Sequence, residues 1–307
     1  MKTAYIVKKG YIDTIQNYFT SETVVHDHLL ISNEDYIPVP WVKNVIHNPK
    51  VFSFDSIKSA ANHLKAIQKN WGYYSLHSQR RGALIADQLR GFPKKPVNFF
   101  ERNNLEKMGF FTLLDHNTLL YSPDTRSPFP CGQTHFQEFP EGPPSRAYLK
   151  LMEALYTLYD RPGPDDICIE IGAAPGGWTW VLEKLCSEVH SYDRSELGYK
   201  AQENVFHKTT NAFTLEPQTL LNEVNHKTSD TRFWLFSDII CYPDALNELI
   251  EKWLRANFID CIVATIKFQG EFSLDQLSKF QTIPGAKIYH LFHNKHEVTF
   301  FWKKPKD

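Results

Sequence analysis

The chain has 307 residues, of which 42% are hydrophobic, 22% are charged and 14% are aromatic, and its formal net charge is −1. This composition is typical of a globular protein. It argues against one that coats nucleic acid indiscriminately, because phosphate binding is driven by lysine and arginine. No apolar run approaches the ~18 residues that span a bilayer, and the amino terminus lacks the apolar core of a signal peptide. We therefore expect a cytoplasmic protein with no membrane partner.

The cysteines and histidines bear on metals and redox state. The five cysteines are an odd number without a Cys-x-x-Cys pair, and Cys168 and Cys261 lie in apolar runs. Such a set is expected to consist of buried free thiols. Because no group of histidines and cysteines has zinc-site spacing, we expect no bound metal.

The length favours two domains. Segments rich in proline and glycine at residues 122–132 and 139–146 are typical of loops and linkers. We therefore expect an α+β amino-terminal domain over residues 1–123, a linker over 124–144 and a second domain over 145–307.

Few elements of the first domain can be predicted from its pattern. Residues 3–8 are apolar enough for a strand, and residues 57–69 repeat apolar side chains with a helical period. Residues 110–114 and 118–121 flank Asp-His-Asn, a pattern typical of a hairpin.

The first domain also contains a basic segment between Ile57 and Lys107. Its three acids are Asp87, Glu101 and Glu106, so its net charge is +7. Trp71, Tyr73 and Tyr74 stand among the cations. Aromatic and basic side chains in such a mixture can stack bases and hold phosphates, and the alternative is that the rings are core and the charges are solvated. We interpret the segment as an RNA-binding surface, with Arg80 and Arg81 as candidate contacts. The ten basic residues are Lys58, Lys65, Lys69, Arg80, Arg81, Arg90, Lys94, Lys95, Arg102 and Lys107.

The second domain alternates strands and helices, which predicts a parallel sheet covered on both faces. Only three residues separate the last two strands. That gap is too short for a parallel crossover, so the final strand must be antiparallel. A Rossmann-like sheet of seven strands with an inverted last strand is therefore expected. The predicted strands are residues 166–172, 188–193, 205–210, 233–239, 260–268, 286–293 and 297–303, and the predicted helices are 177–186, 244–257 and 273–280.

A glycine-rich turn follows the first of these strands. Gly172, Gly176 and Gly177 allow a tight turn and a close approach of the backbone to a ligand, at the amino terminus of a predicted helix. Asp193 ends the next strand, where a carboxylate can accept both ribose hydroxyls of an adenosine. The pattern is not the Gly-x-Gly-x-x-Gly of nicotinamide-binding proteins, since Ala174 and Pro175 occupy its middle. A turn that merely connects strand and helix is the alternative.

The turn at residues 170–179 resembles that of the FtsJ-type ribose methyltransferases, and more closely the RlmM type, which carry Asp-Leu-Gly-Ala-x-Pro-Gly-Gly-Trp-Thr. The resemblance extends over about residues 144–303. It includes Pro-Ser-Arg at 144–146, Leu-Lys-Leu at 149–151, Ser-Asp-Ile at 237–239, Ile-Lys-Phe at 266–268 and His-Asn-Lys-His-Glu-Val-Thr at 293–299. It implies an S-adenosylmethionine-dependent enzyme that methylates a ribose 2′-hydroxyl of RNA. In the RlmM type, the substrate is a cytidine of large-subunit (23S-type) rRNA, modified before subunit assembly finishes.

The resemblance also implies the site residues. The family's Lys-Asp-Lys-Glu tetrad falls on Lys150, Asp238, Lys267 and Glu297, and Arg146 is placed to reach a substrate phosphate. Glu170 and Asn211 depart from the family, which usually has an aspartate and an acid at these positions. The residues expected to bind the cofactor are Gly172, Ala174, Pro175, Gly176, Gly177, Trp178, Asp193, Asn211 and Asp238.

The tetrad suits the displacement chemistry. A ribose hydroxyl is a poor nucleophile until it loses its proton. A lysine can accept that proton only if its pKa falls below its usual ~10.4, which burial and a second nearby cation favour. Lys267 is our candidate base, with Lys150 as the second cation, Asp238 holding the ammonium groups and Glu297 orienting Lys150. Taken singly, Lys150 and Glu297 are better explained as surface charges, and only the four residues together, at strand ends on the same sheet edge as the glycine turn, favour the functional interpretation.

Two other functions remain open on the sequence. An mRNA-cap 2′-O-methyltransferase shares the tetrad, although nothing in the sequence indicates a cap pocket. A catalytically idle RNA-binding or ribosome-assembly factor could keep the fold, but such a protein would be free to lose Lys267. The target nucleotide and the oligomeric state are not specified by the sequence.

Overall fold

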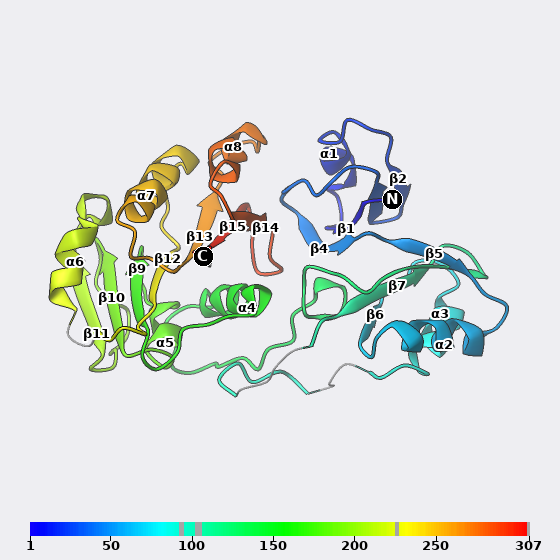
Figure 1. Cartoon of the computed structure of the whole chain (residues 1–307), viewed down its shortest axis with the longest axis horizontal. Coiled ribbons are helices and arrows are strands. Elements are labelled where there is room, and N and C mark those ends of the chain that lie inside the picture. The colour runs from blue at the N-terminus through cyan, green and yellow to red at the C-terminus, as the bar shows by residue number, and fades with distance from the viewer. Residues whose placement is uncertain (92–94, 102–105, 225–226, 306–307) are drawn as a thin grey trace. The chain divides into compact units, whose positions relative to one another are not determined.

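The computed structural model describes residues 1–91, 95–101, 106–224 and 227–305 (Figure 1). It divides into two compact units. The amino-terminal unit consists of Met1–Gln137 with His290–Phe292, and the carboxy-terminal unit of Glu138–Tyr289 with His293–Asp307. The division after Gln137 falls within the segment 124–144.

The amino-terminal unit contains two four-stranded sheets. The first has the order β2-β3-β1-β4 and is antiparallel throughout. In the second, of order β5-β8-β7-β6, β7 and β8 form the predicted hairpin, and β6 joins in parallel. The strands are β1 (Thr3–Val7), β2 (Val24–His26), β3 (Leu29–Ser32), β4 (Val42–His47), β5 (Lys50–Ser53), β6 (Trp71–Tyr73), β7 (Gly109–Leu113) and β8 (Thr118–Ser122), and the helices are α1 (Ile12–Gln16), α2 (Ile57–Ile67), α3 (Gln79–Ala86) and the 3₁₀ turn η1 (Pro130–Gly132).

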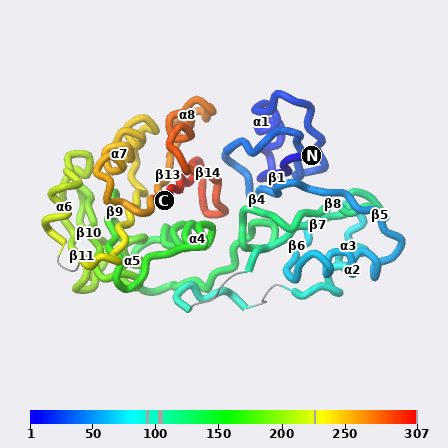
Figure 2. Tube along the Cα trace, viewed as in Figure 1, coloured from blue at the N-terminus to red at the C-terminus, as the bar shows by residue number. Residues whose placement is uncertain are grey.

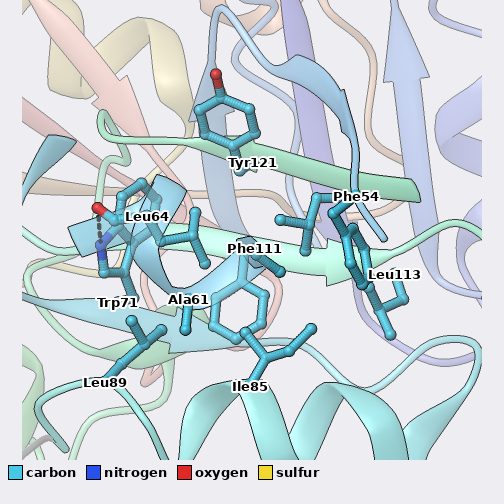
Figure 3. Packing of buried hydrophobic residues seen from close by; sticks show 11 residues of the cluster. Phe54, Ala61, Leu64, Trp71, Ile85, Leu89, Phe111, Leu113 and Tyr121 are labelled. Carbon is cyan, nitrogen blue, oxygen red and sulfur yellow. Dashed lines mark hydrogen bonds between the residues drawn. The ribbon is translucent and has the colours of Figure 1, made fainter. Parts of the chain in front are cut away.

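Helix α2 covers one face of the second sheet. Ser56 caps its first turn by accepting a hydrogen bond from the Ser59 N–H, and its apolar stripe of Ala60, Ala61 and Leu64 is fully buried. These side chains pack with residues from α3 and the sheet in the cluster that Figure 3 shows, in which the indole of Trp71 donates to the Leu64 carbonyl. The period-3.6 pattern therefore predicts this helix correctly.

The carboxy-terminal unit is built on a seven-stranded sheet of order β11-β10-β9-β12-β13-β15-β14. Its central strands β9, β12 and β13 are apolar and buried along almost their whole length, as expected where both faces of a sheet are covered. The Rossmann-like sheet predicted from the sequence is confirmed. The strands are β9 (Ile167–Ile171), β10 (Glu188–Asp193), β11 (Val205–Thr209), β12 (Phe233–Ser237), β13 (Cys261–Lys267), β14 (Lys287–Tyr289) and β15 (Glu297–Lys303).

The last strand has the predicted direction. β15 is antiparallel to both β13 and β14, and its register places Glu297 opposite Lys267. Figure 2 shows the red tube of the last strand next to β13, with which it pairs. Two residues far apart in sequence are thus brought together by strand pairing alone.

Helices lie on both faces of this sheet. Figure 1 shows α7 and α8 on one side and α4 and α5 on the other. Among the described residues, none of the helices has the length and apolar composition needed to span a bilayer. The helices are α4 (Tyr148–Leu158), α5 (Thr179–Leu182), α6 (Pro217–Glu223), α7 (Pro243–Arg255) and α8 (Asp275–Gln281), with a 3₁₀ turn η2 (Ala212–Thr214).

Candidate active site

The glycine turn leaves the carboxyl end of β9, in the middle of the sheet. Gly172 (φ +81°) and Gly176 (φ +106°) have backbone conformations that side chains disfavour. A Cβ on Gly172 would lie 2.6 Å from the Ile239 Cα, and one on Gly176 would lie 2.6 Å from a ring carbon of Tyr199. Glycine is therefore required here both for conformation and for the close approach of neighbouring chain segments.

The helix after this turn is much shorter than predicted. The sequence predicts a helix over 177–186, whereas α5 has only four residues, Thr179–Leu182, followed by turns. Past Leu182 the backbone continues in turns, in which the Leu185 N–H donates three residues back to the Leu182 carbonyl rather than four. So short a helix carries little dipole, and a ligand at the turn would depend on backbone groups and on Asp193.

Asp193 ends β10 and is held beside the turn. Its Oδ2 accepts a hydrogen bond from the Ala174 N–H (3.1 Å) and its Oδ1 accepts one from the Ser195 N–H (2.9 Å). Each oxygen keeps a lone pair for a ligand hydroxyl. Asn211, at the end of the next strand, accepts from the Phe213 N–H (3.3 Å) and so caps η2.

The four residues of the predicted tetrad lie together at the carboxyl ends of the central strands. Asp238, just after β12, contacts both lysines: its Oδ1 is 3.1 Å from the Nζ of Lys150 and 2.9 Å from the Nζ of Lys267. Glu297, at the start of β15, is 2.7 Å from the Lys150 Nζ. Lys267 also donates to the Asp238 carbonyl (2.6 Å). All four side chains are largely buried.

The electrostatics of this cluster favour charged groups. Burial alone would raise the pKa of Asp238, but Lys150 and Lys267 outweigh burial and hold that pKa below its usual value. Burial would likewise lower the pKa of Lys150, yet Asp238 and Glu297 raise it above its ordinary value. Asp238 is therefore ionised and Lys150 protonated at neutral pH.

Side chains that the sequence analysis missed support the tetrad. Thr265, which lies two residues before Lys267 on the same face of β13, donates to Asp238 Oδ1 (2.6 Å). Asn294 donates to Glu297 (3.3 Å). The strand period of two was a signal that could have pointed to Thr265.

Helix α4 also holds the turn that precedes β15. Glu153 lies one helical turn after Lys150, on the same face of α4, and is buried. Its Oε2 accepts from the His293 N–H (3.0 Å) and lies 2.7 Å from His293 Nδ1. One helix therefore fixes both Lys150 and the turn that carries Glu297. The three-residue spacing between Lys150 and Glu153 could have indicated this pair.

Glu170 departs from the family pattern and has an unusual environment. Burial raises its pKa to about 8, although a hydrogen bond from the Thr179 hydroxyl (2.6 Å) acts in the opposite direction. The nearby charges of Asp238 and Asp193 raise the pKa further. The side chain at this position is therefore largely neutral near physiological pH.

A cavity of about 520 Å³ opens at these strand ends. Asp238 and Lys267 line it, whereas Lys150 and Glu297 stand behind Asp238 and do not. Gly176 is covered by Tyr199 and does not line it either. The other expected cofactor residues that line it are Gly172, Ala174, Pro175, Gly177, Trp178, Asp193 and Asn211, and neighbours not foreseen include Arg194, Ser195, Phe213, Ile239 and Ile240.

Two further candidates near the cavity have specific contacts. Trp178 is buried, donates its indole N–H to the Ala147 carbonyl (3.0 Å) and also lines the cavity, so it both packs and faces the site. Arg146 is exposed and pairs with Glu138 (2.9 Å) before α4. It is accessible to solvent and does not line the cavity.

The candidate RNA contacts Arg80 and Arg81 lie on α3 of the amino-terminal unit. Arg80 is exposed, while Arg81 lies over the Phe54 ring (5.2 Å). The expectation that Trp71 stacks bases is wrong, because this ring is 6% exposed and belongs to the core. Tyr73 packs against the same core. Lys94 and Arg102 of the basic segment lie outside the described residues.

The region that carries this cavity matches known proteins. Residues 143–303 match the family model of FtsJ-like methyltransferases. A protein of Halorhodospira halophila named ribosomal RNA large subunit methyltransferase M is 30% identical over 175 residues, which cover 54% of this chain and 48% of that protein. A protein of the same name from Xanthomonas euvesicatoria is 29% identical over 261 residues, or 78% of this chain and 67% of that protein.

These matches cover different shares of this chain and of the relatives. The chain spans about half the length of the first of the curated relatives it matches, 48% and 52% in two cases. Among solved structures, a putative hemolysin from Streptococcus thermophilus is 17% identical with a TM-score of 0.40, covering 59% of this chain and 72% of its own, a similarity too weak to bear on fold or function. The family model covers more than half of the chain, and the chain belongs to the FtsJ-like methyltransferase family.

Proposed function

We propose that this chain transfers a methyl group from S-adenosylmethionine to a ribose 2′-hydroxyl of RNA. Membership of the FtsJ-like methyltransferase family supports methyl transfer. The single observation that carries the proposal is the contact of Asp238 with both Lys150 and Lys267, at the wall of the cavity that the glycine turn also lines. Two lysine nitrogens on one buried carboxylate, one as the accepting amine and one as a fixed positive charge, are suited to moving a proton at a fixed point.

The residues around the cavity fit S-adenosylmethionine. Asp193, fixed by two backbone N–H groups, has acceptors left for both ribose hydroxyls. Asn211 and Phe213 offer a polar edge and a ring for adenine, and the Pro175 turn leaves room for a nucleoside without phosphates. When bound, the cofactor supplies an electrophilic methyl group on a positively charged sulfur.

The chain's own residues accept the proton and hold the base in place. Lys267 faces the cavity and, as the free amine, takes up the proton of the 2′-hydroxyl on its Nζ, while the oxygen of that hydroxyl forms its bond to the methyl group. Asp238 holds the resulting ammonium group through its carboxylate and its carbonyl. Lys150, held by Glu297 behind Asp238, stays protonated and keeps a second positive charge next to the base. Fixed alignment of base and acceptor is itself worth ~7–11 kcal/mol of the barrier.

The proposed acceptor is a cytidine of large-subunit rRNA, in the cytoplasm and before subunit assembly finishes. Two of the relatives described above are named as large-subunit rRNA methyltransferases. Arg80 and Arg146 are exposed cations that could hold the RNA backbone. Phosphate contacts of this kind position an RNA without reading its sequence.

The direct test is methyl transfer by the purified protein. Radiolabelled S-adenosylmethionine and protein-free large-subunit rRNA, prepared from a strain lacking the gene, would be digested to nucleosides and searched for a labelled 2′-O-methylnucleoside. We expect Lys267→Met to lower kcat at least ~100-fold, because general-base catalysis contributes that much or more. Its affinity for S-adenosylhomocysteine should remain close to that of the parent protein.

Lys279→Met is the matched control, since Lys279 is an exposed lysine of α8 paired with Asp244. It should keep full activity. A Lys267→Met protein as active as the control would refute the assignment of the base. A parent protein that labels no 2′-O-methylnucleoside in this RNA would refute the proposed substrate.

A further inference from the structure

Two exposed apolar side chains follow Asp238. Among the described residues, the most exposed large hydrophobic side chains are Ile240 at 79% and Tyr242 at 64%. Single exposed apolar residues are ordinary on a protein surface, but a pair at a functional cavity indicates a contact surface. Both lie within four residues of a member of the tetrad.

The backbone that carries this pair is fixed at both ends. Ile239 packs so closely on the glycine turn that a Cβ on Gly172 would lie 2.6 Å from its Cα. Tyr242 is the extended N-cap of α7, and Pro243 begins that helix. The two side chains are thus held outward by a constrained segment, so little ordering is needed when a ligand binds.

Ile240 also adjoins the reacting groups, and Tyr242 follows it two residues later at the start of α7. Ile240 lines the same cavity as Asp238 and Lys267. Between Asp238 and Asp244 the chain reads Ile-Ile-Cys-Tyr-Pro, without a charged side chain. This segment therefore offers an aliphatic side chain and an aromatic ring that do not repel a polyanion arriving at Lys267.

We propose that Ile240 and Tyr242 form a stacking platform for an unpaired nucleobase of the substrate RNA. The inference rests on the proposed function, which requires a nucleotide to present its ribose to Lys267. Single-stranded RNA is commonly bound with its bases splayed out and stacked on aromatic rings, since every base has a flat apolar face. A base on this platform would place its own ribose, or that of its neighbour, at the mouth of the cavity.

The test compares Tyr242→Ala with Tyr242→Phe, which keeps the ring. The matched control is Phe206→Ala, another exposed aromatic residue, on β11 at the edge of the same sheet. With protein-free large-subunit rRNA from the deletion strain, we expect Tyr242→Ala to raise the KM for RNA roughly 5- to 50-fold, the usual effect of losing one base stack. Tyr242→Phe and Phe206→Ala should keep the parent KM. Calorimetry with S-adenosylhomocysteine should give the same affinity for all four proteins.

Cross-linking provides a second readout that does not require turnover. RNA substituted with 4-thiouridine and irradiated on the protein should attach to the peptide containing residues 240–242. An unchanged KM for Tyr242→Ala, or cross-links confined to other peptides, would overturn the platform while leaving the proposed function intact. An equal loss of S-adenosylhomocysteine affinity would instead make Tyr242 a cofactor contact and also overturn it. A parent protein without methyl transfer to this RNA would count against the proposed function, and cross-linking would still decide the platform.

Discussion

Asp238 organises the site at the scale of single residues. Its carboxylate contacts both lysines of the tetrad and is itself held by Thr265. Removing one partner from such a buried ionic cluster is costly, because the remaining charges lose their compensation. The arrangement also separates roles, since Lys267 faces the cavity whereas Lys150 does not.

Glu170 makes folding stability depend on pH. Its folded pKa of about 8 lies above the ordinary value of 4.5, so between these values the folded state holds a proton that the unfolded state has released. Stability conferred by this group is therefore fully present below the lower value and is lost as pH rises toward the higher one. Glu170→Gln cannot ionise and should become more stable than the parent protein by on the order of 2–4 kcal/mol at pH 8, with little difference at pH 5.

Urea denaturation at the two pH values measures this effect. Glu248→Gln, at an exposed position on α7, is the control and should follow the parent protein at both. A stability difference between Glu170→Gln and the parent that does not grow with pH would contradict the assignment. Nothing in the sequence beyond the substitution of glutamate for aspartate indicated this property, because the property arises from burial against Thr179.

At the scale of elements, the carboxyl edge of the seven-stranded sheet brings the site residues together. Open α/β sheets bind ligands at the carboxyl edge of their parallel strands. This edge carries the turn after β9, the ends of β10, β12 and β13, and the start of β15. The alternation of elements and the expected short gap before the last strand predict the parallel sheet and the direction of β15, but not the strand order or register. The strand predicted over 286–293 ends early, at Tyr289. The length of α5 could not be predicted either, because the chain leaves the helix after Leu182 through turns that its apolar pattern does not indicate.

The close packing of the glycine turn predicts that a side chain at Gly172 weakens both folding and cofactor binding. Gly172→Ala introduces a Cβ at positive φ and 2.6 Å from the Ile239 Cα, so we expect a loss of ~1–3 kcal/mol in stability together with weaker binding of S-adenosylhomocysteine. Gly270→Ala is the matched control, since Gly270 has φ +101° but no heavy atom within 4 Å of the added Cβ. The control should show backbone strain without loss of binding. Equal binding by both variants would mean that the close approach at Gly172 does not shape the cavity.

At the scale of the whole molecule, a unit of the methyltransferase family is joined to an amino-terminal unit that has cores of its own. The family model covers residues 143–303 and so does not reach Met1–Gln137. The aromatic residues of its basic segment turn out to be partly structural, as Trp71 shows, since a single sequence cannot separate core rings from exposed ones. The prediction of an RNA-binding surface therefore depends on the positive charges, of which Arg80 is exposed on α3.

Arg80→Ser tests whether this unit holds RNA. Loss of one phosphate contact should weaken binding of large-subunit rRNA and reduce the slope of log affinity against log salt by about 1. Fluorescence titrations at several salt concentrations measure both quantities. Arg255→Ser, at an exposed arginine at the end of α7, is the control. Identical slopes for Arg80→Ser and the parent protein would exclude Arg80 from the RNA surface.

The central claim is that Lys267 is the base that accepts the hydroxyl proton when a ribose of large-subunit rRNA is methylated. Mass spectrometry of nuclease-digested rRNA from cells lacking the gene, complemented with either the parent protein or Lys267→Met, tests it most directly. We expect one 2′-O-methylcytidine to be absent without the gene, restored by the parent and missing with the variant. An rRNA modification pattern that is the same in all three strains would contradict the account.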